Sequence, residues 1–170
     1  MSDSDLDLTN VDVPAAGGAP PSGGSDRPAA GNQEARAGQP RLGPVAVVGA
    51  GTIGLSWARL FASCGAPVRI FDPRPDLAEV CAGIVAEAPE CEDLLIVAKC
   101  LGEAVDGVRL VQESGPEDPA AKTQLFADLA EYAPDEALLV SSSSAITAST
   151  IAARMTDADA ARVLIAHPFN

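Results

Sequence analysis

The stretch from Pro44 to Gly65 reads PVAVVGAGTIGLSWARLFASCG. Its opening apolar run predicts a short buried β-strand. The segment Thr52–Cys64 has the apolar spacing of an α-helix, with Trp57 and Leu60 on its apolar side, and Gly65 is a typical helix stop. Between strand and helix lies the pattern G-x-G-x-x-G, and this context makes the pattern typical of a turn that binds a dinucleotide.

Each glycine of this motif, which runs from Gly49 to Gly54, has a physical reason to be there. Gly49 allows the tight turn, Gly51 lets a pyrophosphate approach the backbone because it has no Cβ, and Gly54 lets the helix pack close to the sheet. Thr52 and Ile53 begin the helix, where unpaired N–H groups and the helix dipole favour an anion. We therefore expect these residues to bind a coenzyme. The alternative is an ordinary glycine-rich turn.

Asp72 follows the next predicted strand, Val68–Phe71, and lies 18 residues after Gly54. An acidic residue about 20 residues after the glycine motif accepts hydrogen bonds from the adenine ribose. A carboxylate there also repels the 2′-phosphate of NADP, so we predict NAD as the coenzyme. Arg74 could hold that phosphate, which leaves NADP open. Asp72 also has the position of a turn-starting Asp before Pro73, and both roles can coexist.

Short apolar runs alternate with amphipathic segments along the rest of the chain. The runs predict strands at Pro44–Val48, Val68–Phe71, Leu94–Ala98, Val108–Gln112, Ala137–Val140 and Val163–Ala166. The amphipathic segments predict helices at Thr52–Cys64, Asp76–Glu87, Gly102–Asp106, Asp118–Tyr132 and Thr147–Arg154. Such alternation indicates a parallel sheet covered on both faces, and right-handed crossovers then make the sheet doubly wound. The sequence therefore predicts a Rossmann-type doubly wound α/β domain.

Residues 1–42 differ in composition from the rest of the chain. Ala, Gly, Pro, Ser and Asp dominate them, and they show neither helical nor strand periodicity. A segment of this kind buries too little apolar area to offset its chain entropy. We therefore predict a disordered tail over residues 1–42 and a folded domain over residues 43–170.

The chain carries a formal net charge of −13 at pH 7, which argues against nucleic-acid phosphates and anionic membranes as partners. No apolar run approaches the ~20 residues of a membrane-spanning helix. The N-terminus lacks the basic and apolar regions of a secretion signal. The four cysteines have no zinc-site spacing and suggest no disulfide framework. We expect a cytoplasmic protein with reduced thiols and no metal.

Other nucleotide-binding classes can be tested against the same sequence. A short-chain dehydrogenase needs a catalytic Tyr with a Lys one helical turn later, but Tyr132 is the only tyrosine and Glu136 follows it at that distance. A P-loop needs Gly-Lys-Ser/Thr, which the glycine turn lacks. An FAD-binding domain shares the glycine pattern and stays open.

Several pieces of the sequence resemble the 3-hydroxyacyl-CoA dehydrogenase family. They are VAVVGAGTIG at Val45–Gly54, VQESGPED at Val111–Asp118 followed by Lys122, the serines Ser141–Ser144, and AHPFN at Ala166–Asn170. Their order and spacing are similar to those of the family's NAD-binding domain over residues 44–170. The motifs Q-E-S-x-P-E and H-P-F-N are most similar to those of the L-carnitine dehydrogenase and lambda-crystallin branch. The resemblance implies hydride transfer between NAD and a 3-hydroxy acid or a 3-hydroxyacyl-CoA.

The resemblance also implies roles for individual residues. Glu117 and Lys122 match family positions near the nicotinamide ribose. Ser144 matches the serine that hydrogen-bonds the substrate oxygen, with Ser143 as the next candidate. His167 matches the catalytic histidine, and histidine titrates near neutrality, which suits proton transfer in both directions. From local sequence alone, the serines would be a loop or helix cap, His167 a turn residue and Glu117 a first-turn carboxylate.

Two departures from the family shape the expected function. The family's histidine is oriented by a glutamate further along, before an all-helical domain that supplies the substrate pocket and the dimer contact, and both lie beyond Asn170. We therefore expect a truncated product that binds NAD, turns over poorly and does not form the family's homodimer. The segment between Asp72 and Leu94 is short, which favours a small hydroxy acid over a CoA thioester. The alternative function is a non-catalytic dinucleotide-binding module.

Overall fold

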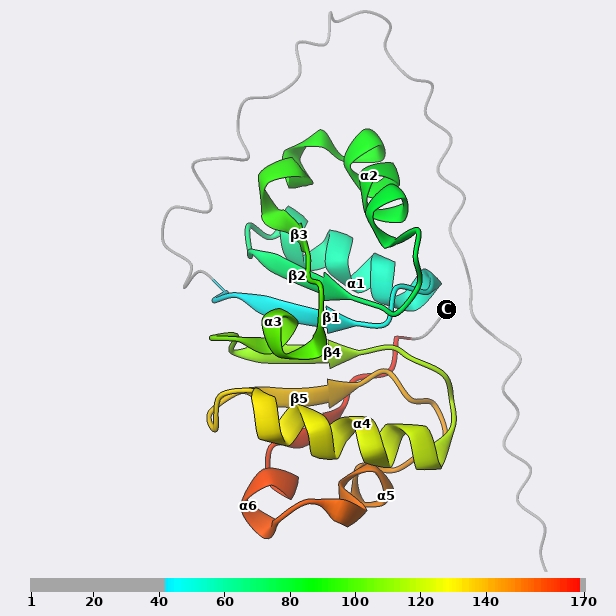
Figure 1. Cartoon of the computed structure of the whole chain (residues 1–170), viewed down its shortest axis with the longest axis vertical. Helices are drawn as coiled ribbons and strands as arrows, with labels where there is room; N and C mark the ends of the chain where they lie inside the picture. The colour runs from blue at the N-terminus through cyan, green and yellow to red at the C-terminus, as the bar shows by residue number, and fades with distance from the viewer. Residues whose placement is uncertain (1–41, 169–170) are drawn as a thin grey trace, which may run out of the picture. The chain divides into compact units, whose positions relative to one another are not determined.

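The sheet of this protein is parallel. The computed structural model describes residues 42–168, and in this part of the chain six strands lie in the order β3-β2-β1-β4-β5-β6 (Figure 1). The strands are β1 (Val45–Val48), β2 (Val68–Phe71), β3 (Leu95–Val97), β4 (Leu110–Glu113), β5 (Leu138–Ser141) and β6 (Val163–Ile165). Two sets of strands thus run outward from the β1–β4 pair, which is the order of a doubly wound Rossmann sheet. The predicted fold class is confirmed.

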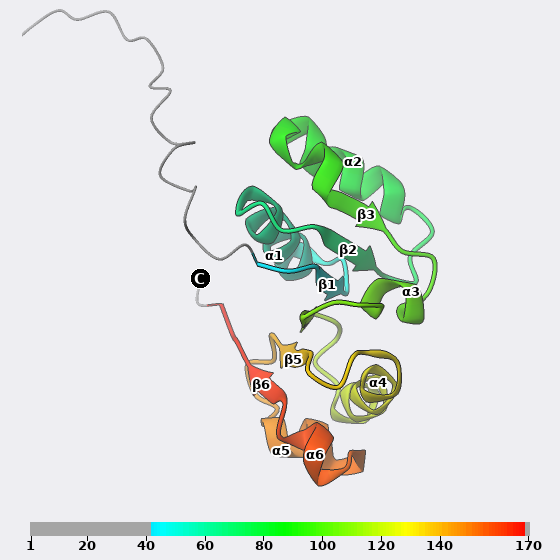
Figure 2. The ribbon, with the colours of Figure 1, turned by 90° about the vertical axis from the view of Figure 1, so that its left-hand side faces the viewer.

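Helices cover both faces of this sheet. One face carries α1, α2 and the 3-10 helix η3, and the other carries α3, α4 and α5. Figure 2 shows α1 and α4 on opposite sides of the strands. The helices are α1 (Thr52–Ser63), α2 (Leu77–Glu87), η3 (Pro89–Leu94), α3 (Leu101–Val105), α4 (Pro119–Tyr132), α5 (Ala148–Ile151), η4 (Ala152–Arg154) and α6 (Asp157–Ala160).

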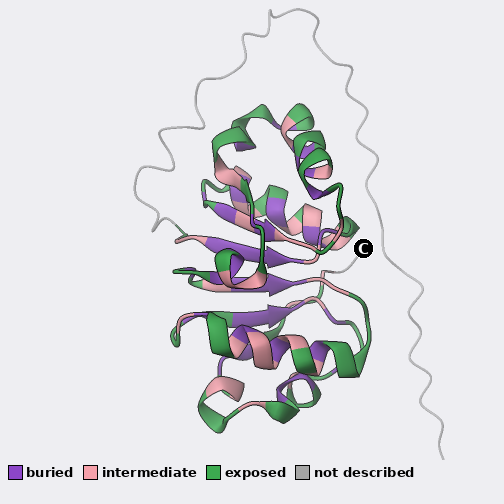
Figure 3. Ribbon diagram, in the orientation of Figure 1, coloured by how far each residue is buried: buried purple, intermediate pink, exposed green. Residues whose placement is uncertain are grey.

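The core lies in two layers, one on each side of the central strand β1. All four residues of β1 are buried. Val47 packs with the helices α1 and α2, whereas Ala46 and Val48 pack with α3 and α4, because alternate side chains of a strand point to opposite faces. In Figure 3 the inner strands β1, β4 and β5 are mostly purple and the outward faces of the helices are green. The apolar run that predicted this strand is therefore continuous because both of its faces are covered.

The two halves of the sheet diverge between β1 and β4, which run side by side with Val48 opposite Glu113. The chain leaves β1 toward α1 on one face and leaves β4 toward α4 on the other. A crevice therefore opens beyond the carboxyl ends of these strands, where folds of this class bind ligands. Gly49 and Ser114 begin the two loops that border it.

β4 begins later than the predicted run Val108–Gln112. Gly107 has φ +64° and turns the chain, so the ladder with β1 starts only at Leu110, opposite Val45. The strand also continues through Glu113, a charged residue at which the apolar run had ended. A buried carboxylate inside a strand is invisible to a pattern of apolar residues.

The region after β5 departs furthest from the prediction. The single helix expected over Thr147–Arg154 is the short helix α5 followed by η4, and α6 was not predicted. Thr147 and Thr156 cap α5 and α6 through their side-chain oxygens. Helices of about one turn are too short for a hydrophobic period to detect.

α1 turns a face of small residues toward the sheet. Gly54, Ala58 and Ala62 are its buried residues. Leu60, predicted on the apolar side, is 50% exposed, and that prediction was wrong. Small residues let the helix approach the strands closely, which leaves a leucine on the neighbouring face outside the contact.

Part of the predicted organisation lies outside the described residues. This holds for the predicted tail, except Leu42, and for Phe169 and Asn170 of the AHPFN motif. Within residues 42–168, no helix combines the length and the apolar character that crossing a membrane requires. The glycine turn, the serine run and His167 all lie within this described part.

Candidate active site

The turn after β1 requires glycine at two positions for steric reasons. Gly49 has φ +99°, and a Cβ there would lie 2.8 Å from backbone atoms of Ser114. A Cβ on Gly54 would lie 1.8 Å from the carbonyl oxygen of Gly49. Because the neighbours are backbone atoms, neither can yield without distorting the turn. The tight turn and the close helix packing predicted at these two glycines are confirmed.

Gly51 is different, because no contact within residues 42–168 requires a glycine there. A Cβ on Gly51 would meet no atom of the described residues within 4 Å, and its φ of −76° suits any residue. It precedes Thr52 and Ile53, whose N–H groups begin α1. The open space at the start of a helix is where an anion binds. This geometry supports the predicted pyrophosphate site.

An open groove of about 510 Å³ borders the glycine turn. Its walls come from both halves of the sheet, with one wall after β1 and β2 and the other after β4. The lining residues are Gly49, Gly51, Asp72, Arg74, Asp76, Ser114, Gly115 and Pro116. The groove thus occupies the crevice between the diverging halves, and it brings the glycine turn and Asp72 together as the sequence predicts.

Asp72 fixes the glycine turn to the end of β2. Its Oδ2 accepts a hydrogen bond from Ala50 N at 2.7 Å, and its Oδ1 accepts one from Arg74 N at 2.9 Å. The second bond is that of a turn-starting Asp, as the local alternative proposes. A carboxylate oxygen has two lone pairs, so each can also accept from a ribose hydroxyl. The structural and the coenzyme-binding roles are therefore compatible.

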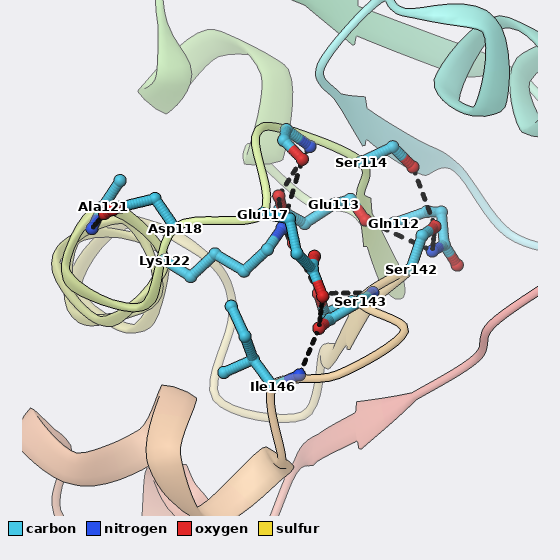
Figure 4. A network of polar contacts seen from close by, with 12 residues as sticks. Gln112, Glu113, Ser114, Glu117, Asp118, Ala121, Lys122, Ser142, Ser143 and Ile146 are labelled. Carbon is cyan, nitrogen blue, oxygen red and sulfur yellow. Dashed lines mark hydrogen bonds and ion pairs between the residues drawn. The ribbon is translucent and has the colours of Figure 1, made fainter.

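A buried ion pair lies behind the β4 wall of the groove (Figure 4). The Lys122 ammonium lies 2.7 and 2.8 Å from the two carboxylate oxygens of Glu113, and the two side chains are 2% and 0% exposed. The Glu113 carboxylate also accepts from Ser141 Oγ and from Gly115 N, each at 2.6 Å. The pair therefore joins α4, β4, β5 and the loop that lines the groove.

The resemblance places Lys122 near the nicotinamide ribose, and direct contact with the coenzyme stays a prediction. In the structure, the ammonium contacts Glu113 and the carbonyl oxygen of Gly115. Glu113 was not predicted, although a signal existed. Lys122 shares a helix face with Phe126 and Leu129, both buried. A lysine on such a face needs a buried partner of opposite charge.

Glu117 ties the loop before α4 to the serine run after β5. Its Oε1 accepts from Ser143 Oγ at 2.6 Å and from the backbone N–H groups of Ser144 and Ala145 at 3.0 Å each. The hydrogen bond from Ser143, followed by those from the backbone, lowers the pKa of the Glu117 carboxyl below its usual value. The serine run is thus held in place by an ionised carboxylate.

We expect Glu117→Gln to destabilise the domain at neutral pH by about 1 kcal/mol, because the acceptor loses its charge at an exposed site. The folded-state pKa of Glu117 lies below the usual glutamate value of 4.5. The stabilisation is therefore present above pH 4.5 and is lost as the pH falls through the folded-state pKa. Urea unfolding at several pH values checks this. A difference between the proteins that stays constant down to strongly acidic pH would contradict it.

Ser143 and Ser144 have different surroundings. Ser143 is buried, and its hydroxyl donates to Glu117 and accepts from Ile146 N at 2.8 Å. Ser144 is exposed, and its hydroxyl makes no hydrogen bond within the described part of the chain. The following helix α5 is capped by Thr147 and not by Ser144. Of the two candidates for the substrate oxygen, the geometry favours Ser144.

Ser142, which was not predicted, links the groove to other elements. Its hydroxyl lies 3.1 Å from Trp57 Nε1, 2.8 Å from Gln112 Nε2 and 2.9 Å from Ser114 Oγ. Indole and amide nitrogens only donate, so Trp57 and Gln112 use both lone pairs of the Ser142 hydroxyl. Ser142 therefore donates its proton to Ser114. The hydroxyl proton of Ser114 is therefore not directed at Ser142. Ser114 itself lines the groove.

His167 is held by the backbone of the same serine. Its ring atom Nδ1 lies 3.1 Å from the Ser142 carbonyl oxygen. A carbonyl oxygen can only accept, so the neutral ring carries its proton on Nδ1 and its lone pair on Nε2. Just before it, Ala166 N donates to Ser141 O at 2.9 Å. The contacts of Ser142 with His167 and with Ser114 therefore connect the imidazole to the groove.

Nitrogen NMR is expected to show the Nδ1–H tautomer of His167 in the folded protein, at a pH where the ring is neutral. The chain contains one histidine, so the assignment is unambiguous. The protein unfolded in urea is the reference, since it lacks the carbonyl contact. A folded protein in which Nε2 carries the proton would contradict the tautomer inferred from the geometry.

A family model described as "3-hydroxyacyl-CoA dehydrogenase, NAD binding domain" matches residues 44–170, which include the glycine turn, the groove and His167. The chain belongs to this family. Its coenzyme is accordingly NAD, as predicted, and Gly51 and Asp72 fit that coenzyme. The roles that the resemblance implied for individual residues of this chain stay predictions.

Named relatives agree with the predicted branch. The chain is 39% identical over 144 residues to a lambda-crystallin homolog of Bos taurus, and the matched region covers 75% of this chain and 44% of the relative. It is 33% identical over 136 residues to an L-carnitine dehydrogenase/betainyl-CoA thioesterase of Rhizobium meliloti (strain 1021), with 74% and 27% covered. The crystal structure of 3-hydroxybutyryl-CoA dehydrogenase from Escherichia coli K12 superposes with a TM-score of 0.69 at 33% identity, with 76% and 30% covered. The chain thus spans less than half the length of each.

Proposed function

We propose that this domain serves an NAD-dependent dehydrogenase that transfers a hydride between NAD and a 3-hydroxy acid or a 3-hydroxyacyl-CoA. The observation that carries the proposal is the contact chain from the groove to the imidazole. Ser114 lines the groove and bonds Ser142, whose carbonyl oxygen accepts from His167 Nδ1. Oxidation of a hydroxyl group needs a base close to the coenzyme, and a histidine oriented in this way supplies one.

The chain's own residues then divide the work. His167 takes the hydroxyl proton, and the Ser142 carbonyl orients its ring through Nδ1. NAD⁺, when bound, supplies the hydride acceptor. The exposed Ser144 hydroxyl donates a hydrogen bond to the substrate oxygen. Glu117 holds the serine loop, and Lys122 holds the loop after β4, so both position the walls beside the nicotinamide ribose.

A small hydroxy acid is the substrate class that we favour. The segment between Asp72 and Leu94 holds only α2 and η3, which leaves little additional surface for a CoA chain. The net charge of −13 also disfavours the phosphates of CoA. The relatives named for L-carnitine agree with this choice.

A non-catalytic dinucleotide-binding module is the second candidate. The observation that favours it is the partner of His167 Nδ1, which is the neutral carbonyl oxygen of Ser142. A carbonyl oxygen at Nδ1 stabilises the imidazolium form less than a carboxylate at Nδ1 does, and a contact of this kind favours slow proton transfer. We therefore propose that the 170-residue chain binds NAD and turns over poorly by itself.

Calorimetry and a turnover assay test these proposals together. The chain is titrated with NADH and NAD⁺ and is then assayed with L-carnitine and with 3-hydroxybutyryl-CoA by the absorbance of NADH. We expect coenzyme binding that His167→Ala leaves intact, and slow turnover that His167→Ala abolishes. Binding without any turnover would indicate the non-catalytic module. No heat with either redox form would reject the assignment, and a yellow purified protein would indicate FAD.

We also propose that the chain works in the cytoplasm. All four cysteines lie within the described residues, and all four are free thiols. Free thiols persist in reducing compartments, which supports this location. Fractionation of the source cells tests it, and recovery of the protein in a membrane or secreted fraction would contradict it.

A further inference from the structure

The charged residues of the groove gather at its β2 end. Asp72, Arg74 and Asp76 all line the same groove as Gly49 and Gly51. Asp72 has the position of the acidic residue that binds the ribose hydroxyls in folds of this class. Arg74 and Asp76 therefore lie where a 2′-phosphate would distinguish NADP from NAD.

Asp76 holds the Arg74 guanidinium in a two-pronged contact. Arg74 Nε lies 2.7 Å from Asp76 Oδ1, and Arg74 Nη2 lies 2.8 Å from Asp76 Oδ2. A third donor, Arg74 Nη1, bonds the Ala50 carbonyl oxygen at 3.2 Å. The Nε–Nη2 edge of a guanidinium is one with which arginine binds carboxylates and phosphates. In this protein that edge is already occupied.

Asp76 makes this contact at the expense of a more usual one. It is the N-cap residue of α2, yet its side chain makes no capping hydrogen bond. An aspartate at an N-cap ordinarily accepts from the first N–H groups of the helix. Here both carboxylate oxygens turn to Arg74 instead. The hydrogen bond from Arg74 keeps the pKa of Asp76 below its usual value, so the carboxylate is charged at neutral pH.

We propose that Asp76 is a specificity-determining residue that maintains the preference for NAD over NADP by occupying and neutralising Arg74. This inference rests on the coenzyme-binding half of the proposed function. With Asp76 present, the negative charges of Asp76 and Asp72 both act on one guanidinium, and a 2′-phosphate of about −1.5 to −2 charge meets a net negative site. Without Asp76, Arg74 balances Asp72 and offers a free edge to that phosphate.

The test compares the dissociation constants of NADPH and NADH for the whole chain, measured by calorimetry without any substrate. For Asp76→Ala we expect NADPH to bind about tenfold more tightly, from the removal of one repelling charge. NADH affinity should change by less than about threefold, because the exposed Arg74–Asp76 pair contributes little to the fold. Asp76→Asn should shift NADPH binding in the same direction by a smaller factor.

Two further variants test whether the effect needs the position of Asp76 and the guanidinium of Arg74. Glu79→Ala removes the same charge from the first turn of α2 but not from the groove, and it should leave both coenzymes unaffected. Arg74→Ala combined with Asp76→Ala should cancel the gain, since the proposed phosphate ligand is then absent. An unchanged NADPH to NADH ratio in Asp76→Ala overturns the proposal, and so does an equal gain in Glu79→Ala.

The outcome is separable from that of the proposed function. A chain that binds both coenzymes but shows no turnover contradicts the dehydrogenase proposal and leaves this ratio readable. A wild-type chain that binds NADPH as tightly as NADH overturns the role of Asp76, whereas a chain that binds neither coenzyme rejects the coenzyme-binding half of the proposed function.

Discussion

Lys122→Met is expected to destabilise the domain by about 3–5 kcal/mol, because it leaves the buried carboxylate of Glu113 without its counter-charge. Glu113 is 0% exposed, so water cannot replace the ammonium. The hydrogen bonds that Ser141 and Gly115 donate to Glu113 remain. These donors are neutral, so they do not replace the positive charge of the ammonium. Urea unfolding followed by circular dichroism measures the loss.

The matched control is Lys99→Met, because Lys99 is exposed and its change should alter stability by less than about 0.5 kcal/mol. The double variant Glu113→Gln with Lys122→Met should recover much of the loss, since no unpaired charge then remains buried. If Lys122→Met unfolds at nearly the same urea concentration as the wild type, the ion pair does not hold these elements together.

Gly51→Ala is expected to weaken NADH binding by about 5- to 150-fold, the range that corresponds to about 1–3 kcal/mol of steric overlap. Within the part of the chain that the structure describes, the new methyl group meets no atom within 4 Å, so we expect the overlap to arise with a bound pyrophosphate. The fold should be nearly unaffected, because the loss of an N-cap glycine and the gain in backbone restriction are both small and oppose one another. Calorimetry with NADH and thermal unfolding measure the two quantities.

Gly54→Ala provides the contrast, since its methyl group would lie 1.8 Å from the Gly49 carbonyl oxygen. We expect it to lower stability by at least about 3 kcal/mol, because a backbone atom must move. The Gly51 variant therefore tests coenzyme binding, and the Gly54 variant tests the stability of the fold. Equal losses of stability in both variants would contradict this division, and so would unchanged NADH binding in Gly51→Ala.

Much of the fold could be predicted because its signals are local. The strand, turn and helix around Gly49 lie within about twenty consecutive residues, and short apolar runs identified each of the six strands described. The predicted end of β4 was wrong because a polar residue is buried there. Glu113 belongs to β4 although its charge breaks the apolar run, because its partner Lys122 lies on a helix that the strand pattern does not include.

The candidate site divides in the same way. The resemblance to a known family gave roles to His167, Ser144 and Glu117, but it gave none to Ser142 or Asp76. The hydroxyl of Ser142 bonds Trp57 across 85 residues and Ser114 across 28. No periodicity or spacing rule relates positions so far apart, and serine is common in loops for unrelated reasons.

By itself, the sequence determined the alternation of strands and helices, the glycine turn and the acidic residue after β2. These depend on neighbours along the chain and on the backbone freedom of glycine, both of which can be read from residue types. Only the tertiary structure decided that the Ser142 carbonyl holds His167, that Lys122 is buried against Glu113 and that Asp76 occupies Arg74. Those contacts depend on the direction of side chains after packing, and geometry of that kind arises only when the sheet has assembled.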